Sequence, residues 1–482
     1  MRKAVGSQSF FRRITAFLLV AMTVLLSACS KGLTMSGRQT LTVWSSYADQ
    51  DVELLIKNYQ SVHPNVEVIH TTHGLPNHFS FLKERMAQGL GPDVAIVPDE
   101  ELSSMIELGL VEDLEKYSLN TSNFNSKALL SLRAENKHLY SVPFAFQTMA
   151  LCYNRAQTTN PPATFKAVLD QAHQGKGVAI DSGFLSSVWG VGAMGGTFFN
   201  SVNQFTLEEQ AVSRWLSWLK NAQQIPNVYV DNRRDVLFNL FTTGKVAYFP
   251  CWMFEISTLQ EKLGDRLSVA ILPGNLHVAS PALKTDSLIL NIHAPTAQKL
   301  LALDFAEFVT RREQQLAFQS AQDTIVIPSN PEALVDRRLF PIRRSLVEQA
   351  QYSFPIPIAP AQYRIGRLVY YADAIYPQVM QGNISPAEGA HQFVNQINQP
   401  GNHEITNESA SIINEAGISK VQGDLTPKAD YLPQLFRIQL QIFHRPIIWL
   451  QIVLITVVGV LIWLIARRLN RFISKFAQRF TE

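Results

Sequence analysis

Apolar residues change between strand-like and helix-like spacing along the first part of the chain. Strands are expected at 41–44, 66–69 and 93–97, where β-branched or aromatic residues alternate with polar ones or form a short apolar run. Helices are expected between them at 51–62 and 77–88; the first places its apolar residues on one face. This alternation predicts an α/β domain whose ligands bind at the carboxyl ends of the strands.

The second half of the chain repeats this alternation. Residues 206–209 have the sequence of a capping box and predict the start of a helix, in which Trp215 and Trp218 are expected to pack in the core. Further elements are expected as strands at 246–249 and 288–290, a long amphipathic helix within 298–317, and a polar linker and juxtamembrane segment at 401–446.

The N-terminus has the organisation of a bacterial export signal. Basic residues precede an apolar run at 14–26, which is shorter than the roughly 20 residues that a membrane-spanning helix needs. The run ends in LSAC at 26–29, which resembles a lipobox. We therefore expect residues 1–28 to be a signal peptide, Cys29 to carry the lipid and 29–40 to be a tether; an ordinary signal with a chance cysteine is the alternative.

A second membrane segment is expected near the C-terminus. Residues 447–466 contain Gln451 as the only strongly polar side chain, and Trp449 and Trp463 lie near the two ends, as interfacial aromatic residues do. The tail at 467–482 is basic, which predicts a cytoplasmic C-terminus with everything before the helix outside. A buried core helix is the alternative. The sequence thus predicts an anchored protein at the cell membrane with its main domain on the periplasmic or extracellular side.

Composition narrows the class of protein further. The 482 residues are 46% hydrophobic, which is enough for two sizeable cores, and the formal net charge is only +3. A nucleic-acid-binding domain is expected to be strongly basic, so the charge argues against that class. The sequence also lacks a phosphate-binding Gly-rich lysine loop, a Gly-x-Ser-x-Gly motif and a metalloprotease helix, so neither an enzyme nor a cofactor is expected.

Two sets of residues leave alternatives open. Cys152 and Cys251 could form a disulfide in an oxidising compartment, but we favour two buried free thiols. His70, His73 and His78 could suggest a metal site, since imidazole is a common ligand. They straddle a strand end and a loop without a regular helical pair, so we expect loop histidines near a cleft and no metal.

Five segments, in this order, resemble family 1 of the bacterial extracellular solute-binding proteins, the substrate-binding components of ABC transporters typified by maltose-binding protein. The resemblance covers residues 41–399. The segments are LTVWSSYADQDVELLIKNYQSVHPNVEV, FLKERMAQGLGPDVAIVPDEELSSMIELGLVEDL, HLYSVPFAFQTMALCYNR, FTTGKVAYFPCWMFEI and LALDFAEFVTRREQQLAF. No single segment is specific, but their order is.

The resemblance implies a two-lobed periplasmic-binding-protein fold of type II, with hinge crossings inside a solute-binding region at 41–400. Its lobes would be 41–146 with 284–328, and 147–283 with 329–400. A carbohydrate or polyol would bind between the lobes and favour their closure. The partners implied are a permease and an ATPase on separate chains. The alternatives are another solute (polyamine, iron chelate or phosphodiester), or a membrane-tethered sensor with the same fold.

The resemblance also implies which residues contact the ligand. They follow predicted strands or lie at lobe crossings. Their side chains offer aromatic faces or hydrogen-bond acceptors for hydroxyl groups, and the glycines let the backbone approach the ligand closely. The residues are Trp44, Tyr47, Asp49, Asp99, Glu100, Phe146, Gln147, Gly195, Gly196, Trp252, Asp286 and Tyr363. Trp252 has the position at which relatives present a stacking tryptophan. The late ligand tryptophan of the maltose-binding pattern is absent, which argues against maltodextrin itself.

Several of these positions have a purely structural alternative. Asp49 could cap the helix that follows it. Asp99 and Glu100 could form an exposed acidic turn, and the glycine pair at 195–196 could form a simple turn. Trp252 could be buried between helices of one lobe.

Overall fold

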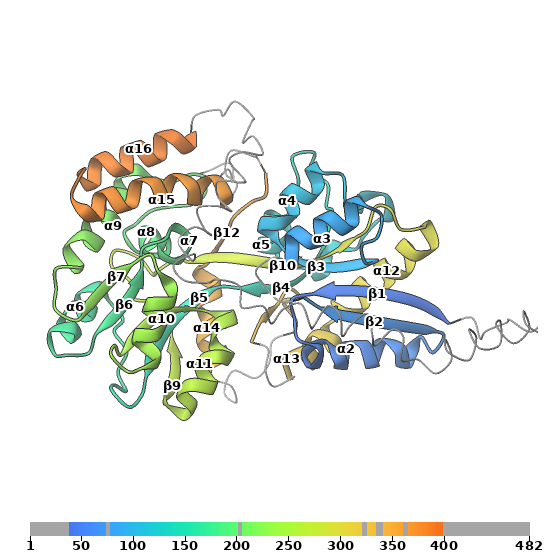
Figure 1. The fold of residues 1–482 in the computed structure, drawn as a ribbon, viewed down its shortest axis with the longest axis horizontal. Helices are drawn as coiled ribbons and strands as arrows, with labels where there is room; N and C mark the ends of the chain where they lie inside the picture. Colours follow the sequence, from blue (N-terminus) through green and yellow to red (C-terminus); the bar gives the residue numbers. More distant parts are fainter. Residues whose placement is uncertain are drawn as a thin grey trace, which may run out of the picture. The chain divides into compact units, whose positions relative to one another are not determined.

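The structure is a computed structural model that describes residues 38–73, 78–200, 205–320, 325–333, 341–359 and 365–398 (Figure 1). The predicted signal peptide, Cys29, Tyr363, the linker, the predicted transmembrane helix and the basic tail lie outside these residues. Within the described ranges, no helix is both long enough and apolar enough to cross a membrane.

The first of two β-sheets has seven strands in the order β11-β4-β10-β3-β1-β2, with β12 paired to β10. The strands β1, β2 and β3 are parallel, while β10 runs antiparallel to β3 and β4. Their bounds are β1 Gln39–Ser45, β2 Val66–Thr72, β3 Val94–Pro98, β4 Val142–Gln147, β10 Ala282–Leu290, β11 Ile327–Pro328 and β12 Phe354–Pro355. The late strand β10 therefore lies in the centre of a sheet built mainly from the N-terminal part of the chain.

Helices from residues 49–132 and from residues 296–320 pack on the first sheet. They are α2 Asp49–Val62, α3 His78–Ala87, α4 Asp99–Glu107, α5 Ser126–Leu132, α12 Thr296–Val309 and α13 Arg312–Ser320. Leu55 and Tyr59 of α2 are buried, and the Tyr59 hydroxyl donates to Asp304 of α12 at 2.8 Å. The single long helix expected within 298–317 is in fact two helices, separated at Thr310 and Arg311.

The second sheet has five strands in the order β7-β6-β8-β5-β9. Its strands are β5 Met149–Asn154, β6 Val178–Asp181, β7 Val228–Asp231, β8 Tyr248–Trp252 and β9 Leu267–Ala270. The accompanying helices are α6 Phe165–His173, α7 Phe184–Ser187, α8 Trp189–Ala193, α9 Glu209–Ala222, α10 Arg234–Thr242, α11 Ile256–Leu263, α14 Pro341–Tyr352, α15 Ile365–Gln381 and α16 Pro386–Asn398. The C-terminal helices α15 and α16 pack against α9 (Figure 1).

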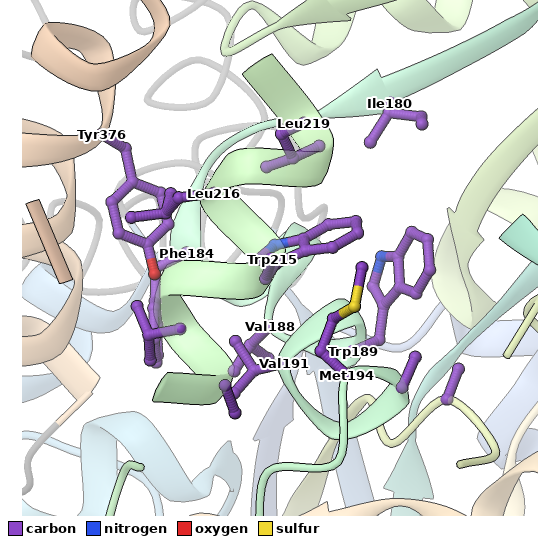
Figure 2. Packing of buried hydrophobic residues seen from close by; sticks show 14 of the residues in the cluster. Ile180, Phe184, Val188, Trp189, Val191, Met194, Trp215, Leu216, Leu219 and Tyr376 are labelled. Atoms are coloured by element: carbon purple, nitrogen blue, oxygen red, sulfur yellow. The ribbon is translucent and has the colours of Figure 1, made fainter. Parts of the chain in front are cut away.

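An aromatic core holds the helices of the second sheet together. Trp215 of α9 is fully buried and packs at 5.0 Å between ring centroids from Trp189 of α8, while Phe184 and Tyr376 lie nearby (Figure 2). The expectation that Trp215 is a core residue is confirmed. A Cβ on Gly190 would lie 2.3 Å from this indole ring, so only glycine allows α8 to approach α9 this closely.

Three segments that connect the two sheets meet at Thr148. This residue separates β4 from β5 and is fully buried. Its hydroxyl donates to the Ala282 carbonyl at 3.1 Å, where the chain returns into β10, and lies 2.8 Å from Ser353 Oγ, next to β12. The crossings are thus joined by hydrogen bonds at one buried point.

A disulfide joins Cys152 of β5 to Cys251 of β8, so the expectation of two free thiols is wrong. The strands are antiparallel neighbours, and their register pairs Cys152 with Phe249 and Ala150 with Cys251. This diagonal placement brings the two Cα atoms to 5.7 Å, within the range that a disulfide spans. The residues are 99 positions apart, so local sequence patterns could not show their proximity.

Candidate functional site

A cavity of about 930 Å³ lies among elements of both sheets. The elements of the first sheet supply Ser46, Tyr47, Ala48, Gln50, Asp51, Phe79, Pro98 and Glu100, and those at the crossings supply Gln147, Lys284, Asp286 and Ile325. The second sheet contributes the single-turn helix η3 (Met253–Glu255) and α11, through Met253, Phe254, Ser257, Gln260 and Glu261. The volume is at the upper end of that of small-molecule sites.

The ends of the strands explain why these residues meet. Tyr47 follows β1, and Glu100 follows β3 as the second residue of α4. Parallel neighbouring strands end at the same edge of a sheet, so these side chains share that edge. The central antiparallel strand β10 passes the same edge near its start and adds Lys284 and Asp286.

Tyr47 and Asp286 form a short hydrogen bond at the cavity. The Tyr47 hydroxyl donates to Asp286 Oδ2 at 2.6 Å. Burial raises the pKa of Tyr47 well above its ordinary range, and the neighbouring Asp286 raises it further. Burial also raises the pKa of the Asp286 carboxyl, although the bond from Tyr47 opposes this shift. The pair fixes the loop after β1 to the central strand.

Lys284 and two acidic residues form a charged group beside this pair. Lys284 Nζ lies 2.5 Å from Glu100 Oε1 and 5.6 Å from the centroid of the Trp252 ring. Burial opposes the charge of Lys284, but the Glu100 carboxylate outweighs it and raises the pKa of the lysine. Asp99 accepts the Thr285 amide at 3.0 Å; burial and then Glu100 raise the pKa of Asp99 well above its usual value.

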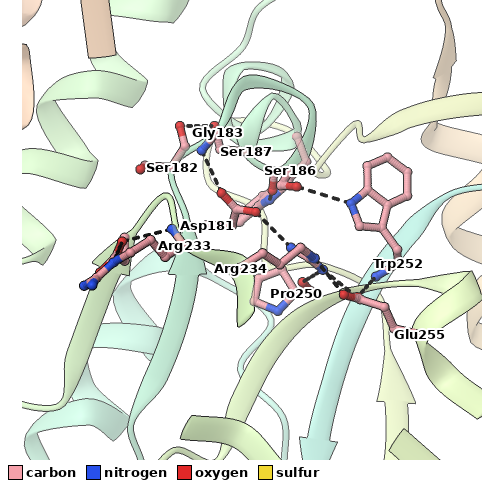
Figure 3. Close-up of polar contacts among 12 residues, drawn as sticks. Asp181, Ser182, Gly183, Ser186, Ser187, Arg233, Arg234, Pro250, Trp252 and Glu255 are labelled. Carbon is pink, nitrogen blue, oxygen red and sulfur yellow. Dashed lines mark hydrogen bonds and ion pairs between the residues drawn. The ribbon is translucent and has the colours of Figure 1, made fainter. Parts of the chain in front are cut away.

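A buried ion-pair network holds the part of the cavity that the second sheet supplies (Figure 3). Arg234 makes two bonds to the Glu255 carboxylate, at 2.7 and 2.6 Å, and one to Asp181 at 3.1 Å. Glu255 in turn accepts the Trp252 amide at 2.8 Å, and the Trp252 indole donates to Ser186 Oγ at 3.2 Å. The network therefore fixes both ends of η3.

Trp252 supports the cavity and does not line it. Its side chain is 5% exposed, and its ring stacks on Phe254 with the centroids 5.9 Å apart. Phe254 is 58% exposed and does line the cavity. An exposed aromatic face held by a buried one can stack on an apolar ligand surface.

Of the residues predicted to contact a ligand, the structure brings Tyr47, Glu100, Gln147 and Asp286 together at the cavity. The other described ones lie outside its lining: Trp44, Asp49, Asp99, Phe146, Gly195, Gly196 and Trp252. Tyr363 is outside the described residues. The role of each as a ligand contact stays a prediction.

Trp44 and Asp49 lie beside the predicted histidine loop. β1 extends to Ser45, so Trp44 is inside the strand, with its ring stacked at 5.8 Å on Phe81. Asp49 lies in the first turn of α2 and makes no cap bond; its carboxylate accepts from His70 Nδ1 and Thr72 Oγ1, both at 2.8 Å. These bonds lower the pKa of Asp49, with the Thr72 bond the largest cause.

Phe146 and the glycine pair serve packing. Phe146 is 2% exposed in the core around the disulfide. Gly195 has a φ of +89° in the turn after α8, where a side chain would be strained. A Cβ on Gly196 would lie 2.8 Å from Ala211 Cβ of α9, so this glycine permits close helix packing.

Phe254, Lys284 and Phe79 are cavity residues that sequence reasoning missed. Phe254 lies five residues after the predicted strand at 246–249 and two after Trp252, and this closeness to an expected ligand residue is a signal that could have found it. Lys284 begins the return into the first sheet, where only Asp286 was expected. Among the described residues, there is no group of three or more His, Cys, Asp and Glu side chains able to hold a metal ion.

Two α/β sheets joined by buried crossings, with a cavity lined from both, have the architecture of a two-lobed binding protein. The family model for bacterial extracellular solute-binding proteins matches residues 55–337, more than half of the chain. The chain belongs to this family, and the resemblance found in the sequence is confirmed. Membership of an extracellular family places the described domain outside the cytoplasm, in agreement with its disulfide.

Individual relatives support the same class. The maltotriose-binding protein of Pyrococcus abyssi is 27% identical over 177 residues, which are 34% of this chain and 38% of that protein. The GacH receptor of Streptomyces glaucescens, studied unliganded and with acarbose, has a similar structure with a TM-score of 0.63 at 16% identity. That match covers 74% of this chain and 97% of the receptor.

The maltose-binding periplasmic protein of Listeria monocytogenes, solved with maltose, has a TM-score of 0.63 at 18% identity. It covers 77% of this chain, and 99% of the Listeria chain is matched. At these identities the two structural matches establish the fold and leave the solute of this protein open.

Proposed function

We propose that this protein is the substrate-binding component of an ABC importer, which captures a carbohydrate or polyol in the cavity and presents it to a permease. The observation that carries the proposal is the placement of the cavity at strand ends of the first sheet, facing η3 and α11 of the second. The relatives whose names mention maltotriose and maltose favour a carbohydrate.

The chemistry of the lining suits a polyhydroxylated solute. Glu100, Gln147 and Asp286 offer oxygen acceptors for hydroxyl groups. Phe79 and Phe254 offer apolar faces, one from the elements of each sheet. A solute that touches both sets favours closure by its differential affinity for the closed form.

Calorimetric titration of the full chain in detergent, with a panel of sugars and polyols, tests this function. We expect saturable binding of at least one of them, weakened in Asp286→Asn, with Asp265→Asn as a control. Asp265 lies in the short helix η4 (Gly264–Arg266) and does not line the cavity. If no sugar or polyol binds, or if Asp286→Asn binds as the wild type does, the proposal fails.

We further propose that the domain is held at the outer face of the membrane by a lipid on Cys29 and by the predicted helix at 447–466. An anchored binding protein remains within reach of its transporter. Metabolic labelling with a palmitate analogue is expected to mark the wild type and not Cys29→Ala. Absence of label on the wild type would leave the C-terminal helix as the proposed anchor.

A further inference from the structure

The cavity has many more acidic than basic side chains. Among the described residues, its lining contains the acids Asp51, Glu100, Glu261 and Asp286 and one basic residue, Lys284. Lys284 is already paired with one oxygen of Glu100. Acidic residues thus outnumber basic ones in the described lining, although Asp51 also has an interaction partner.

The unpaired buried atoms of this site are all acceptors. Glu100 Oε2 and Gln147 Oε1 are buried atoms of the lining that find no hydrogen-bond partner among the described residues. Beneath Glu100, Asp99 is 1% exposed and its Oδ1 also has no partner in that part of the chain. Two donors beside these oxygens are already used, because Lys284 bonds to Glu100 and the Tyr47 hydroxyl bonds to Asp286. A ligand that brings donors would satisfy the two lining oxygens.

Charge distinguishes between two kinds of donor. A neutral hydroxyl group can satisfy an orphaned oxygen but leaves the negative charge uncompensated when the lobes exclude water. Burying an unpaired charge is costly, and an opposite charge in good geometry offsets much of that cost.

We propose that the solute carries a protonated aliphatic amino group, which the cavity binds through the Glu100 and Asp286 carboxylates and the Gln147 amide oxygen. The inference rests on the proposed function, because it names the substrate class of the same site. An amino sugar and a linear polyamine share this chemistry. The exposed face of Phe254 suits the apolar face of a sugar ring and favours the amino sugar.

Calorimetry on the full chain in detergent with matched probes tests the inference. The probes are the β-1,4-linked trimer of glucosamine, its N-acetylated counterpart, maltotriose and spermidine. We expect the free-amine trimer to bind at least about tenfold more tightly than the acetylated one, since a hydrogen bond to a charged group is worth about 1.5–3 kcal/mol and 1.4 kcal/mol is tenfold.

Variants assign the effect to the carboxylates. Glu100→Gln and Asp286→Asn should each reduce the preference for the amine by about tenfold. Glu101→Gln is the matched control: it is the next residue on α4, is paired with Lys83 at 3.0 Å, does not line the cavity, and should leave the preference unchanged. Melting temperatures of each variant show whether the fold is retained, and the second carboxylate variant remains informative if the first does not fold.

The outcomes separate this inference from the proposed function. Tighter binding of maltotriose or of the acetylated trimer would overturn the amine and support the carbohydrate function. Binding of spermidine alone would support the amine and contradict a carbohydrate solute. If neither amine binds, or if both carboxylate variants keep the full amine preference, the inference is overturned.

Discussion

The Tyr47 hydroxyl donates a 2.6 Å hydrogen bond to the Asp286 carboxylate, across 239 positions of sequence. The contact joins the loop after the first strand to the central strand that returns from the second sheet. Both residues line the cavity, so one bond fixes two parts of the candidate site in a single geometry. The shape of the site therefore depends on pairing between distant segments.

Tyr47→Phe tests the importance of this contact. Removing the hydroxyl leaves a buried Asp286 oxygen without its donor, so we expect the free energy of unfolding to fall by about 1–3 kcal/mol. Urea denaturation of the full chain in detergent measures this. Tyr370→Phe removes a hydroxyl from a 49% exposed tyrosine and should change stability by no more than about 0.5 kcal/mol. If the two variants are equally stable, the Tyr47–Asp286 hydrogen bond does not stabilise the fold.

Arg234→Met tests the network behind η3. It leaves the Glu255 and Asp181 carboxylates buried without their cation, so we expect a loss of about 3–5 kcal/mol in stability. Weaker solute binding and altered tryptophan fluorescence should accompany it, because Glu255 also holds the Trp252 amide.

Arg233→Met is the matched control for this substitution. Its side chain is 67% exposed, and its partner is Asp231, at the end of β7. The expected loss is about 0–1 kcal/mol, as for other surface ion pairs. Similar losses in both variants, or full solute affinity in a folded Arg234→Met, would contradict the role given to the network.

The disulfide predicts a dependence of stability on redox conditions. Reduction, or the double substitution Cys152→Ala with Cys251→Ala, should lower the free energy of unfolding by about 2–5 kcal/mol, because the bridge closes a long loop of the unfolded chain. Thermal denaturation with and without reductant measures the effect. The double variant is its own control, since its melting temperature should not respond to reductant. If reductant lowers the melting temperature of the double variant as much as that of the wild type, the loss of stability does not come from this disulfide.

His78 predicts an acid sensitivity of the domain. Its ring is buried, neither nitrogen has a partner among the described residues, and burial lowers the pKa to about 4 from an ordinary 6.5. Above pH 6.5 the residue is neutral in both folded and unfolded chains and has no effect. As the pH falls from 6.5 towards 4, the unfolded chain takes up a proton first, so up to about 3 kcal/mol of stability is lost.

Denaturation midpoints between pH 7 and pH 4 measure this effect. His78→Gln removes the titrating group and should flatten the pH dependence over that window. His293→Gln changes an exposed histidine after β10 and serves as the matched control, with the slope of the wild type expected. If His78→Gln retains the wild-type slope, another group causes the acid sensitivity.

Local periodicity predicted β1, β2 and β3 well, because each of them shows a regular pattern of apolar residues. Tyr47, Glu100 and Asp286 could be placed at the site from their positions near such strands. Trp44 was expected to contact the ligand from the end of its strand, and nothing in its neighbouring residues indicated that the ring packs on Phe81.

Other features depend on contacts that no local pattern contains. Phe254 reaches the cavity because Arg234 binds Glu255 from α10, and Cys152 meets Cys251 because β5 and β8 pair in one register. The break in the helix expected within 298–317 occurs at Thr310, whose hydroxyl donates to the Ala306 carbonyl at 2.9 Å. Tertiary packing decides each of these positions.

Capture of a solute between the lobes is tested most directly by the distance between them. Fluorophores on Glu53→Cys and Lys166→Cys, in a Cys29→Ser background, would report on α2 and α6, where both side chains are exposed. A saturating solute should shorten the distance, and Asp286→Asn should require a higher solute concentration for the same change. Tight binding with an unchanged distance, or closure unaffected by Asp286→Asn, would contradict capture in this cavity.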